Sequence, residues 1–166
     1  LAPLLGWLLD YLNIPMSDFS AGPGQQAPLS LAGQRIGVSI CYEDAFSTRI
    51  NTALPDATVL ANLSEDAWFG DSLAPHQRLQ MARARALETG RPMIRSSNNG
   101  LSSLIGPDGA VNALAPQFET AVVRGTVQPM TGVTPAVRYG NLPVGLGCLF
   151  LLGIGLWRRK AAGGHA

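Results

Sequence analysis

The segment from Arg35 to Asp44 reads RIGVSICYED, an apolar run that ends on a cysteine, a tyrosine and two acids. This pattern is typical of a buried strand that delivers a thiol to its carboxyl end. In open α/β sheets, active-site groups gather beyond the carboxyl ends of strands, so Cys41 is a candidate nucleophile. The plainer interpretation is a buried structural cysteine, because free cysteine is among the most buried residue types. The polar residues that follow Cys41 argue against an inert apolar site.

Other parts of the chain predict a mixed α/β sheet around this strand. A second short apolar run, residues 57–62, is followed by the acids and aromatics of Ser64 to Asp71. Two strands thus bring polar and aromatic side chains to one edge of the sheet. The turn signals Asn98-Asn99-Gly100 and Pro107-Asp108-Gly109 separate later strands. The expected elements are helices at 46–54 and 75–89, and strands at 57–62, 92–97, 101–105 and 121–127.

The helix expected over 75–89 has a proline in its first turn and is stopped by Gly90. Its polar side chains predict a solvated or salt-bridged face, with ligand contact as the alternative. These side chains are Arg78, Arg83, Arg85 and Glu88. A single histidine near a helix start, His76, is expected as a surface or capping residue rather than a general base.

The first thirty residues carry less information. Leucines at helical spacing over 1–12 predict an amphipathic helix, packed either on a core or on a membrane surface. Residues 13–31 are rich in proline and glycine, which predicts a long loop that is functional or mobile. The sequence opens on Leu1 without a signal-peptide pattern, and we interpret it as a piece of a longer protein.

Composition excludes several classes of function. Charged residues make up 14% of the chain and the net charge is +1, so a nucleic-acid surface is not expected. The two cysteines, Cys41 and Cys148, lie far apart, and no disulfide framework or metal-ligand spacing is present. We expect neither a metal nor a cofactor.

The end of the chain has the pattern of a membrane span. Residues 139–157 contain no charge and are bracketed by Tyr139 and Trp157, as interfacial aromatics would be. Arg158-Arg159-Lys160 follow at once, which predicts that the tail is cytoplasmic and the preceding domain on the far side. A buried core helix is the alternative. The predicted parts are a domain at 1–138, a transmembrane helix at 139–157 that holds Cys148, and a tail at 158–166.

An ordered set of short motifs resembles the apolipoprotein N-acyltransferase family, part of the carbon-nitrogen hydrolase (nitrilase-like) superfamily. Any one of these motifs alone is weak, but together they cover nearly the whole chain. They are Ile-Cys-Tyr-Glu at 40–43, Asp-Ala-Trp-Phe-Gly at 66–70, Pro-His-Gln at 75–77, Gln-Met-Ala-Arg at 80–83, Arg-Ala-Leu-Glu at 85–88, Arg-Pro at 91–92, Asn-Asn-Gly at 98–100 and Thr-Gly-Val-Thr-Pro at 131–135.

The resemblance implies the C-terminal portion of an αββα sandwich with a Cys nucleophile, followed by one transmembrane helix. It implies a bacterial inner-membrane protein, multi-pass at full length, with the catalytic domain in the periplasm. An acyl chain would pass from a phospholipid through a Cys41 thioester to the N-terminal diacylglyceryl-cysteine of an apolipoprotein. We expect a monomer in the lipid bilayer.

By the same resemblance, Cys41 is the nucleophile, Glu43 a supporting acid and the Tyr42 N–H an oxyanion donor. Trp68 and Phe69 would line the approach of the acyl chain, with a core aromatic pair as the alternative.

Two departures from the family pattern lead to further expectations. The family's general-base glutamate and its lysine lie upstream of the matching region. A glutamate beside a thiol raises the thiol pKa, and nothing obvious in this sequence lowers it, so we expect the chain alone to be inactive. Glu65 stands where the family has asparagine, and sequence alone assigns it no role.

Two other classes of protein share part of this pattern. A soluble-type amidase or nitrilase would share Cys41 and the sandwich, but it has no need of the apolar segment at 1–12 or of the span at 139–157. The alternative enzyme is therefore a nitrilase-like amidase with a membrane anchor. A non-catalytic, membrane-anchored binding module explains the span and leaves the Cys-Tyr-Glu motif unexplained.

Overall fold

The computed structural model describes residues 26–163. The helix expected over residues 1–12 and the loop up to residue 25 lie outside the described residues. Six strands form one mixed sheet in the order β1-β2-β3-β4-β5-β6. The strands are β1 Leu29–Leu31, β2 Gln34–Ile40, β3 Val59–Glu65, β4 Met93–Asn98, β5 Ser103–Ile105 and β6 Val111–Leu114.

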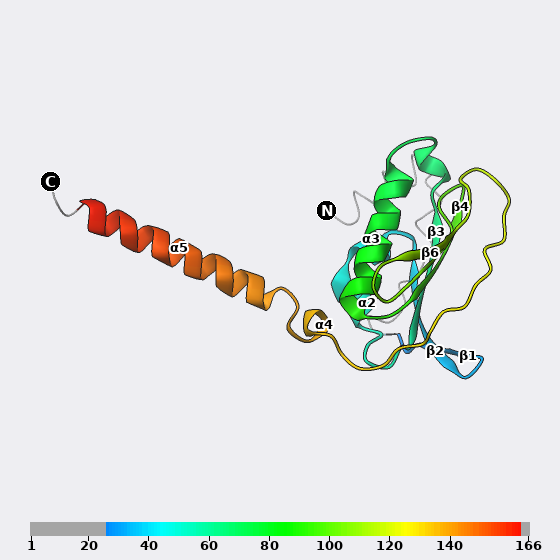
Figure 1. Cartoon of the computed structure of the whole chain (residues 1–166), viewed down its shortest axis with the longest axis horizontal. Coiled ribbons are helices and arrows are strands. Elements are labelled where there is room, and N and C mark those ends of the chain that lie inside the picture. The colour runs from blue at the N-terminus through cyan, green and yellow to red at the C-terminus, as the bar shows by residue number, and fades with distance from the viewer. Residues whose placement is uncertain (1–25, 164–166) are drawn as a thin grey trace, which may run out of the picture.

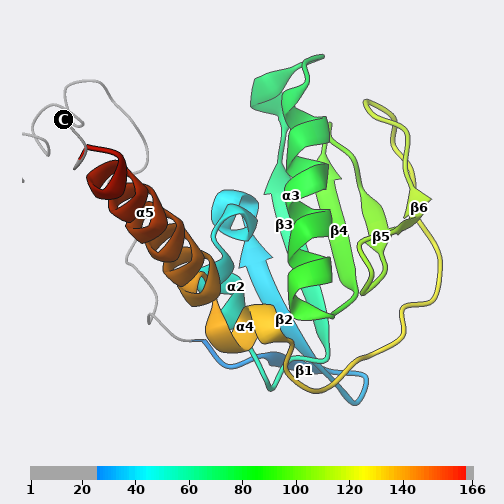
Figure 2. The ribbon, with the colours of Figure 1, turned by 60° about the vertical axis from the view of Figure 1, so that its left-hand side comes forward.

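The three central strands are parallel and the outer ones antiparallel, which confirms the predicted mixed sheet. β2 pairs with β3 and β3 with β4 in parallel register, so the arrowheads of these strands point the same way (Figure 2). β1, β5 and β6 add antiparallel edges. The residues that follow β2, β3 and β4 therefore lie at one edge of the sheet.

Two expectations about the strands are wrong. Leu29–Leu31, expected as part of a loop, pairs with β2 as β1. The strand expected over 121–127 is absent: these residues are mostly exposed and join no ladder among the described residues, whereas the unpredicted Val111–Leu114 pairs with β5. A run with strand propensity becomes a strand only where a neighbouring edge accepts its hydrogen bonds.

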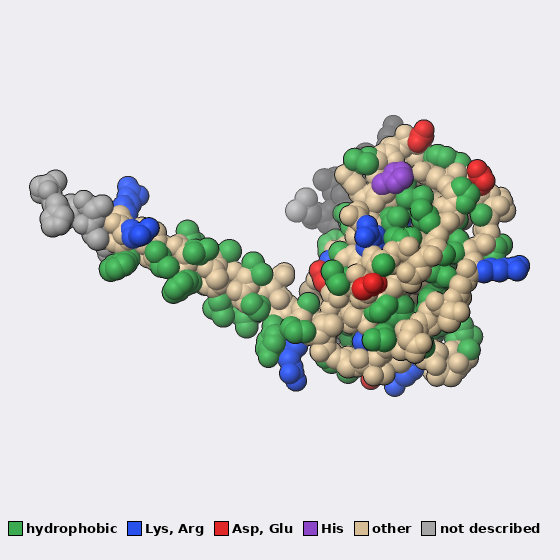
Figure 3. Space-filling model, in the orientation of Figure 1, with side chains coloured by type: hydrophobic (Ala, Val, Ile, Leu, Met, Phe, Trp, Pro, Cys, Tyr) green, Lys and Arg blue, Asp and Glu red, His purple; other side chains and the backbone are tan. Residues whose placement is uncertain are grey.

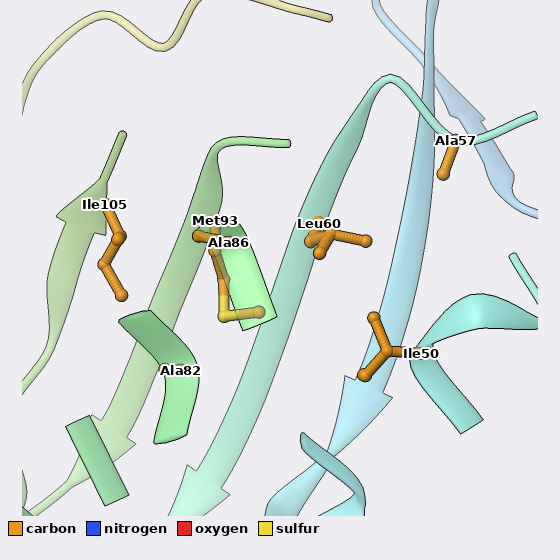
Figure 4. Close-up of a cluster of buried hydrophobic side chains, with 7 residues drawn as sticks. All are labelled: Ile50, Ala57, Leu60, Ala82, Ala86, Met93 and Ile105. Carbon is orange, nitrogen blue, oxygen red and sulfur yellow. The ribbon is translucent and has the colours of Figure 1, made fainter. Parts of the chain in front are cut away.

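Two helices cover one face of the sheet and build the core there. α2 spans Ser47–Asn51, inside the helix expected at 46–54, and α3 spans Ala74–Thr89, one residue longer than expected. Small side chains at four-residue spacing let α3 lie close to the sheet. The buried cluster in Figure 4 consists of Ile50, Ala57, Leu60, Ala82, Ala86, Met93 and Ile105.

The opposite face of the sheet carries exposed apolar side chains. Successive strand residues point to opposite faces, so Val38, Ile40, Leu63 and Ile94 lie away from α2 and α3. All four are exposed. Residues 26–163 thus form one sheet covered on one face, which is half of the αββα sandwich expected from the sequence.

The last helix, α5 (Leu142–Gly163), projects away from this domain (Figure 1). Residues 142–159 have a mean hydropathy of 1.3 and none of them is buried, so the helix is long and apolar enough to cross a bilayer. Apolar side chains lie along its visible surface, and basic side chains follow at its far end (Figure 3). Tyr139, expected inside the span, instead ends the preceding short helix α4 (Pro135–Tyr139).

A link segment, residues 130–134, fastens α4 to the end of α3. The Met130 N–H donates to the Thr58 carbonyl at 3.0 Å, and Arg91 Nη2 donates to the Gly132 carbonyl at 2.7 Å. The Thr134 hydroxyl donates to the Glu88 carbonyl and accepts the Val137 N–H at 3.2 Å, which caps α4. The path from the sheet to α5 is therefore held by defined hydrogen bonds.

Candidate active site

Cys41 lies at the carboxyl end of β2, where the sequence predicts it. It is the first residue of the 3₁₀ turn η1 (Cys41–Ala45), and its thiol is half-buried. Its φ of 52° lies in the left-handed region, which is strained for a residue with a side chain. The Asn62 side chain holds the turn by donating to the Cys41 carbonyl at 3.1 Å and to the Ser39 hydroxyl at 3.0 Å. The sharp turn presents the thiol beyond the strand end.

Arg78 brings a positive charge directly to this thiol. Its Nη1 lies 3.5 Å from Cys41 Sγ. This contact lowers the pKa of the Cys41 thiol, burial opposes it, and the backbone N–H groups of Glu65 and Tyr42 also favour the thiolate. The expectation that nothing in this chain lowers the thiol pKa is therefore wrong. Of the solvated or salt-bridged face expected for Arg78, the structure has the salt-bridged form: the side chain is only 4% exposed and lies within ion-pair distance of Asp44 and Asp66.

Beneath Cys41, four charged side chains form a buried ion cluster of Asp44, Asp66, Arg78 and Arg95. Arg95 donates to Asp44 at 3.0 Å and to Asp66 at 3.1 Å. Arg78 Nε lies 3.4 Å from Asp66, and Arg78 Nη2 lies 3.9 Å from Asp44. Two cations thus alternate with two anions, an arrangement that offsets the large cost of burying each charge alone.

Neighbouring polar groups complete the ion cluster. Arg95 also donates to Asn62 Oδ1 at 2.6 Å, and the hydroxyl of Ser97 donates to Asp66 at 2.6 Å. Burial raises the pKa of the Asp44 carboxyl, while the guanidinium groups of Arg95 and Arg78 oppose that rise. Asn62 belongs both to this cluster and to the Cys41 turn, so the cluster is coupled to the position of the nucleophile.

Glu43 makes its contacts on the other side of the turn. Its carboxylate accepts the Ile40 N–H at 2.8 Å and pairs with Arg49 at 3.2 Å. It thereby fixes the backbone just before Cys41. With these contacts, Glu43 can act either as a positioning group for the turn or as the expected supporting acid.

Tyr42 and Phe46 form the wall of a shallow pocket beside the thiol. Their rings meet edge to face with centroids 5.7 Å apart, and the Arg78 guanidinium carbon lies 5.7 Å from the Tyr42 ring centroid. The pocket has a volume of about 590 Å³. Its lining residues are Ile40, Cys41, Tyr42, Glu43, Phe46, Thr48 and Arg49.

The residues after β3 occupy the same edge of the sheet. Glu65 accepts the Asn98 side-chain amide at 2.9 Å and the Ala67 N–H at 2.7 Å, and these two bonds lower the pKa of its carboxyl. Through these two bonds Glu65 holds the ends of β3 and β4 together.

The two aromatic residues expected near the acyl chain lie on the 3₁₀ turn η2 (Ala67–Phe69). Trp68 is 89% exposed and Phe69 is also exposed, so a core aromatic pair is ruled out. Neither lines the pocket beside Cys41. His76 is exposed at the start of α3, as expected of a surface residue.

Sequence reasoning missed the ion cluster, although its positions carry a signal. Arg78 falls four residues before Ala82 and eight before Ala86, so it shares their buried stripe on α3. Arg95 follows Met93 by two residues and therefore points to the same core face of β4. A charge at a core-facing position of a helix or strand predicts a buried partner of opposite sign.

The arrangement suits nucleophilic chemistry at a thiol. A half-buried cysteine with a cation at its sulfur is biased toward the reactive thiolate, and nearby backbone N–H groups offer donors for a developing oxyanion. The single lysine of the sequence is Lys160, within the bounds of α5. Within residues 26–163, no group of three His, Cys, Asp or Glu side chains is placed to bind a metal.

Comparisons with known proteins find relatives that match most of this chain. Apolipoprotein N-acyltransferase of Chromobacterium violaceum is 46% identical over 95% of this chain and 31% of its own length. The protein of the same name from Nitrosomonas europaea is 50% identical over 85% of the chain and 28% of its length. The chain therefore spans about a third of these relatives. An amidase from Nesterenkonia sp. AN1 aligns with a TM-score of 0.45 at 22% identity, over 57% of this chain and 40% of that one.

The conserved-family profile described as carbon-nitrogen hydrolase matches residues 14–136. This match includes Cys41, the ion cluster and every strand of the sheet. The chain belongs to the carbon-nitrogen hydrolase family.

Proposed function

We propose that this chain is part of an apolipoprotein N-acyltransferase in which Cys41 carries the acyl group. The observation that carries the proposal is the contact of Arg78 with the Cys41 sulfur at the open edge of the sheet. The similarity to proteins named apolipoprotein N-acyltransferase and the apolar helix α5 support it.

The reaction would proceed in two steps. The Cys41 thiolate attacks the carbonyl carbon of a phospholipid ester. The C–S bond forms, the C–O bond breaks, and the lysophospholipid oxygen leaves and takes up one proton. The α-amine of the apolipoprotein's N-terminal cysteine then attacks the thioester, the C–N bond forms, the C–S bond breaks, and the amine loses one proton. A thioester suits this role because it remains reactive toward amines.

The side chains around Cys41 are assigned supporting roles. Glu43 positions the backbone of the turn through Ile40, and the Tyr42 N–H donates to the oxyanion of each tetrahedral intermediate. The pocket formed by Ile40, Tyr42 and Phe46 has the apolar surface that an acyl chain needs. Trp68 and Phe69, exposed on η2, contact the outer part of the donor lipid.

The proposal extends to location. α5 spans the bacterial inner membrane with its Arg158 end in the cytoplasm, and the sheet domain lies in the periplasm. The 166-residue chain alone is inactive, because it lacks the general-base glutamate and the lysine that the family resemblance implies.

The test is acyl labelling of the full-length protein that contains this chain. It is incubated with a phospholipid carrying a labelled acyl chain and compared with Cys41→Ser. We expect hydroxylamine-sensitive label on the wild type alone. Absence of label from a folded, membrane-inserted wild-type protein would contradict the proposal and favour the binding module.

An anchored amidase is the second candidate, because the family profile is that of carbon-nitrogen hydrolases. Dependence on lipid separates the two enzymes. An amidase would form its acyl-enzyme from a small soluble amide without phospholipid, whereas the transferase requires the phospholipid.

A further inference from the structure

The reaction proposed above assigns no step to Arg78, although its side chain contacts the Cys41 sulfur. It lies in the first turns of α3, buried at 4% exposure, and its guanidinium group bridges the ion cluster and the Cys41 sulfur. One role for a buried arginine here is to neutralise Asp44 and Asp66. The contact distances of Arg78 indicate a second role, at the Cys41 sulfur.

Arg95 and Arg78 face the same two aspartates but are bound very differently. Arg95 makes three hydrogen bonds of 2.6 to 3.1 Å. Arg78 lies 3.4 Å from Asp66 and 3.9 Å from Asp44, and its Nε and Nη2 have no hydrogen-bond partner. Arg95 therefore bonds one oxygen of each carboxylate, while Asp44 Oδ1, like Nε and Nη2 of Arg78, has no hydrogen-bond partner. The ion cluster thus holds Arg78 only through the longer contacts.

The third nitrogen of Arg78, Nη1, is directed at Cys41, while Nε and Nη2, without hydrogen-bond partners, lie toward the two aspartates. Its Nη1 contacts Cys41 Sγ at 3.5 Å, and its guanidinium lies near the Tyr42 ring, which shields one side from water. A thiolate accepts a charged N–H bond far better than a thiol does. Loss of the thiol proton to water would therefore tighten this contact and draw Arg78 toward the sulfur.

The surrounding charges leave Arg78 as the cation at the sulfur. The elements packed around Cys41 carry these charged or titratable side chains: Arg35 on β2, Tyr42, Glu43 and Asp44 on η1, Arg49 on α2, Glu65 at the end of β3 with Asp66 after it, His76, Arg78, Arg83, Arg85 and Glu88 on α3, and Arg95 on β4. Arg49 pairs with Glu43, and Arg95 is bound to Asp44 and Asp66.

We propose that Arg78 is a catalytic residue that stabilises the Cys41 thiolate through a direct N–H to sulfur contact, with Asp66 and Asp44 as the positioning residues that hold Arg78. The inference rests on Cys41 as the acyl carrier of the proposed function. It supplies, from within this chain, a cation for the thiolate in addition to any that other parts of the full-length protein provide.

The test is the pH dependence of Cys41 alkylation by iodoacetamide, measured by mass spectrometry in the full-length protein. All variants carry Cys148→Ala, which removes the other thiol of this chain. We expect the wild-type midpoint to lie below the ordinary thiol value of about 8.5. Arg78→Met should raise the midpoint by about one pH unit. At pH values below the midpoint, this is a tenfold loss of the thiolate fraction.

The matched control is Arg83→Met. Arg83 lies on the same helix and bonds the Gly109 carbonyl and Gln80, and this substitution should leave the midpoint unchanged. Equal midpoints in Arg78→Met and wild type, or a wild-type midpoint at or above 8.5, would overturn the inference.

If Arg78→Met does not fold, Arg78→Lys carries the test. One ammonium group cannot contact both Asp66 and the sulfur as the guanidinium does, so a smaller upward displacement is expected. An unchanged midpoint in this folded variant would overturn the inference. Alkylation needs no phospholipid, so a shifted midpoint without acyl labelling would refute only the proposed function.

Discussion

Glu43 lies two residues after the nucleophile, yet its carboxylate is engaged with the Ile40 N–H and Arg49. If its role is to hold the backbone, Glu43→Gln should keep the acyl-labelling rate within about threefold, because the amide oxygen still accepts the N–H and an exposed ion pair contributes little. Glu43→Ala loses the acceptor, about 1.4 kcal/mol, and should label about tenfold more slowly. The rates are compared by pulse labelling.

The contrast between these two variants separates positioning from proton transfer. Equal and large losses in both would assign the Glu43 carboxylate to proton transfer, the role of a supporting acid. A larger loss in Glu43→Ala alone fits the observed contact with Ile40.

The position of Cys41 at the end of a strand was predictable from sequence, and its charged surroundings were not. Cys41 ends an apolar run, which is a local pattern. The ion cluster brings together Asp44, Arg78 and Arg95 from three separate elements and Asp66 from the connection after β3, and only the sheet register and the position of α3 make them neighbours. The periods of the helix and the strand predict that Arg78 and Arg95 are buried. No pattern in the sequence predicts which residues they pair with.

Among the elements, the link segment and α4 determine how the sheet domain is joined to α5. Thr134→Val removes both the hydroxyl bond to Glu88 and the cap on Val137, a loss of about 1 kcal/mol. We expect trypsin to cleave after Arg138 in α4 roughly fivefold faster, because α4 opens more often. Cleavage is followed by gel electrophoresis.

Thr126→Val provides the control, since Thr126 is exposed and lies before the link segment. It should leave cleavage after Arg138 at the wild-type rate. Equal acceleration in both variants would show that Thr134 does not fasten α4 to α3.

Elements with strong local patterns were predicted well, and those that depend on a partner were not. α3 was found to within one residue because Pro75 and Gly90 mark its ends. The run over 121–127 has strand propensity without a partner edge among the described residues, and Val111–Leu114 is too short to stand out before its pairing with β5 is known.

Taken as a whole, the molecule has two parts: a sheet domain suited to water and the apolar helix α5, suited to a lipid bilayer. Because Arg158 and Arg159 follow the apolar stretch, we predict that the C-terminus is cytoplasmic. Green fluorescent protein fused after Ala166 should fluoresce, since it folds in the cytoplasm and not when exported unfolded. Alkaline phosphatase fused after Gly140 should be active, because it requires the periplasm.

The reciprocal fusions are the controls. Phosphatase activity at Ala166 together with fluorescence at Gly140 would reverse the orientation and place Cys41 on the cytoplasmic side, which the proposed function does not allow.

The left-handed backbone at Cys41 makes the fold less stable at the residue that carries the thiol. A side chain at φ 52° costs roughly 1 to 2 kcal/mol that glycine would not. Selection for a robust fold alone would favour glycine at this position, so the cysteine persists only where its reactivity is needed. Serine keeps the same backbone penalty and removes only the sulfur, whereas glycine would change the turn and the chemistry together.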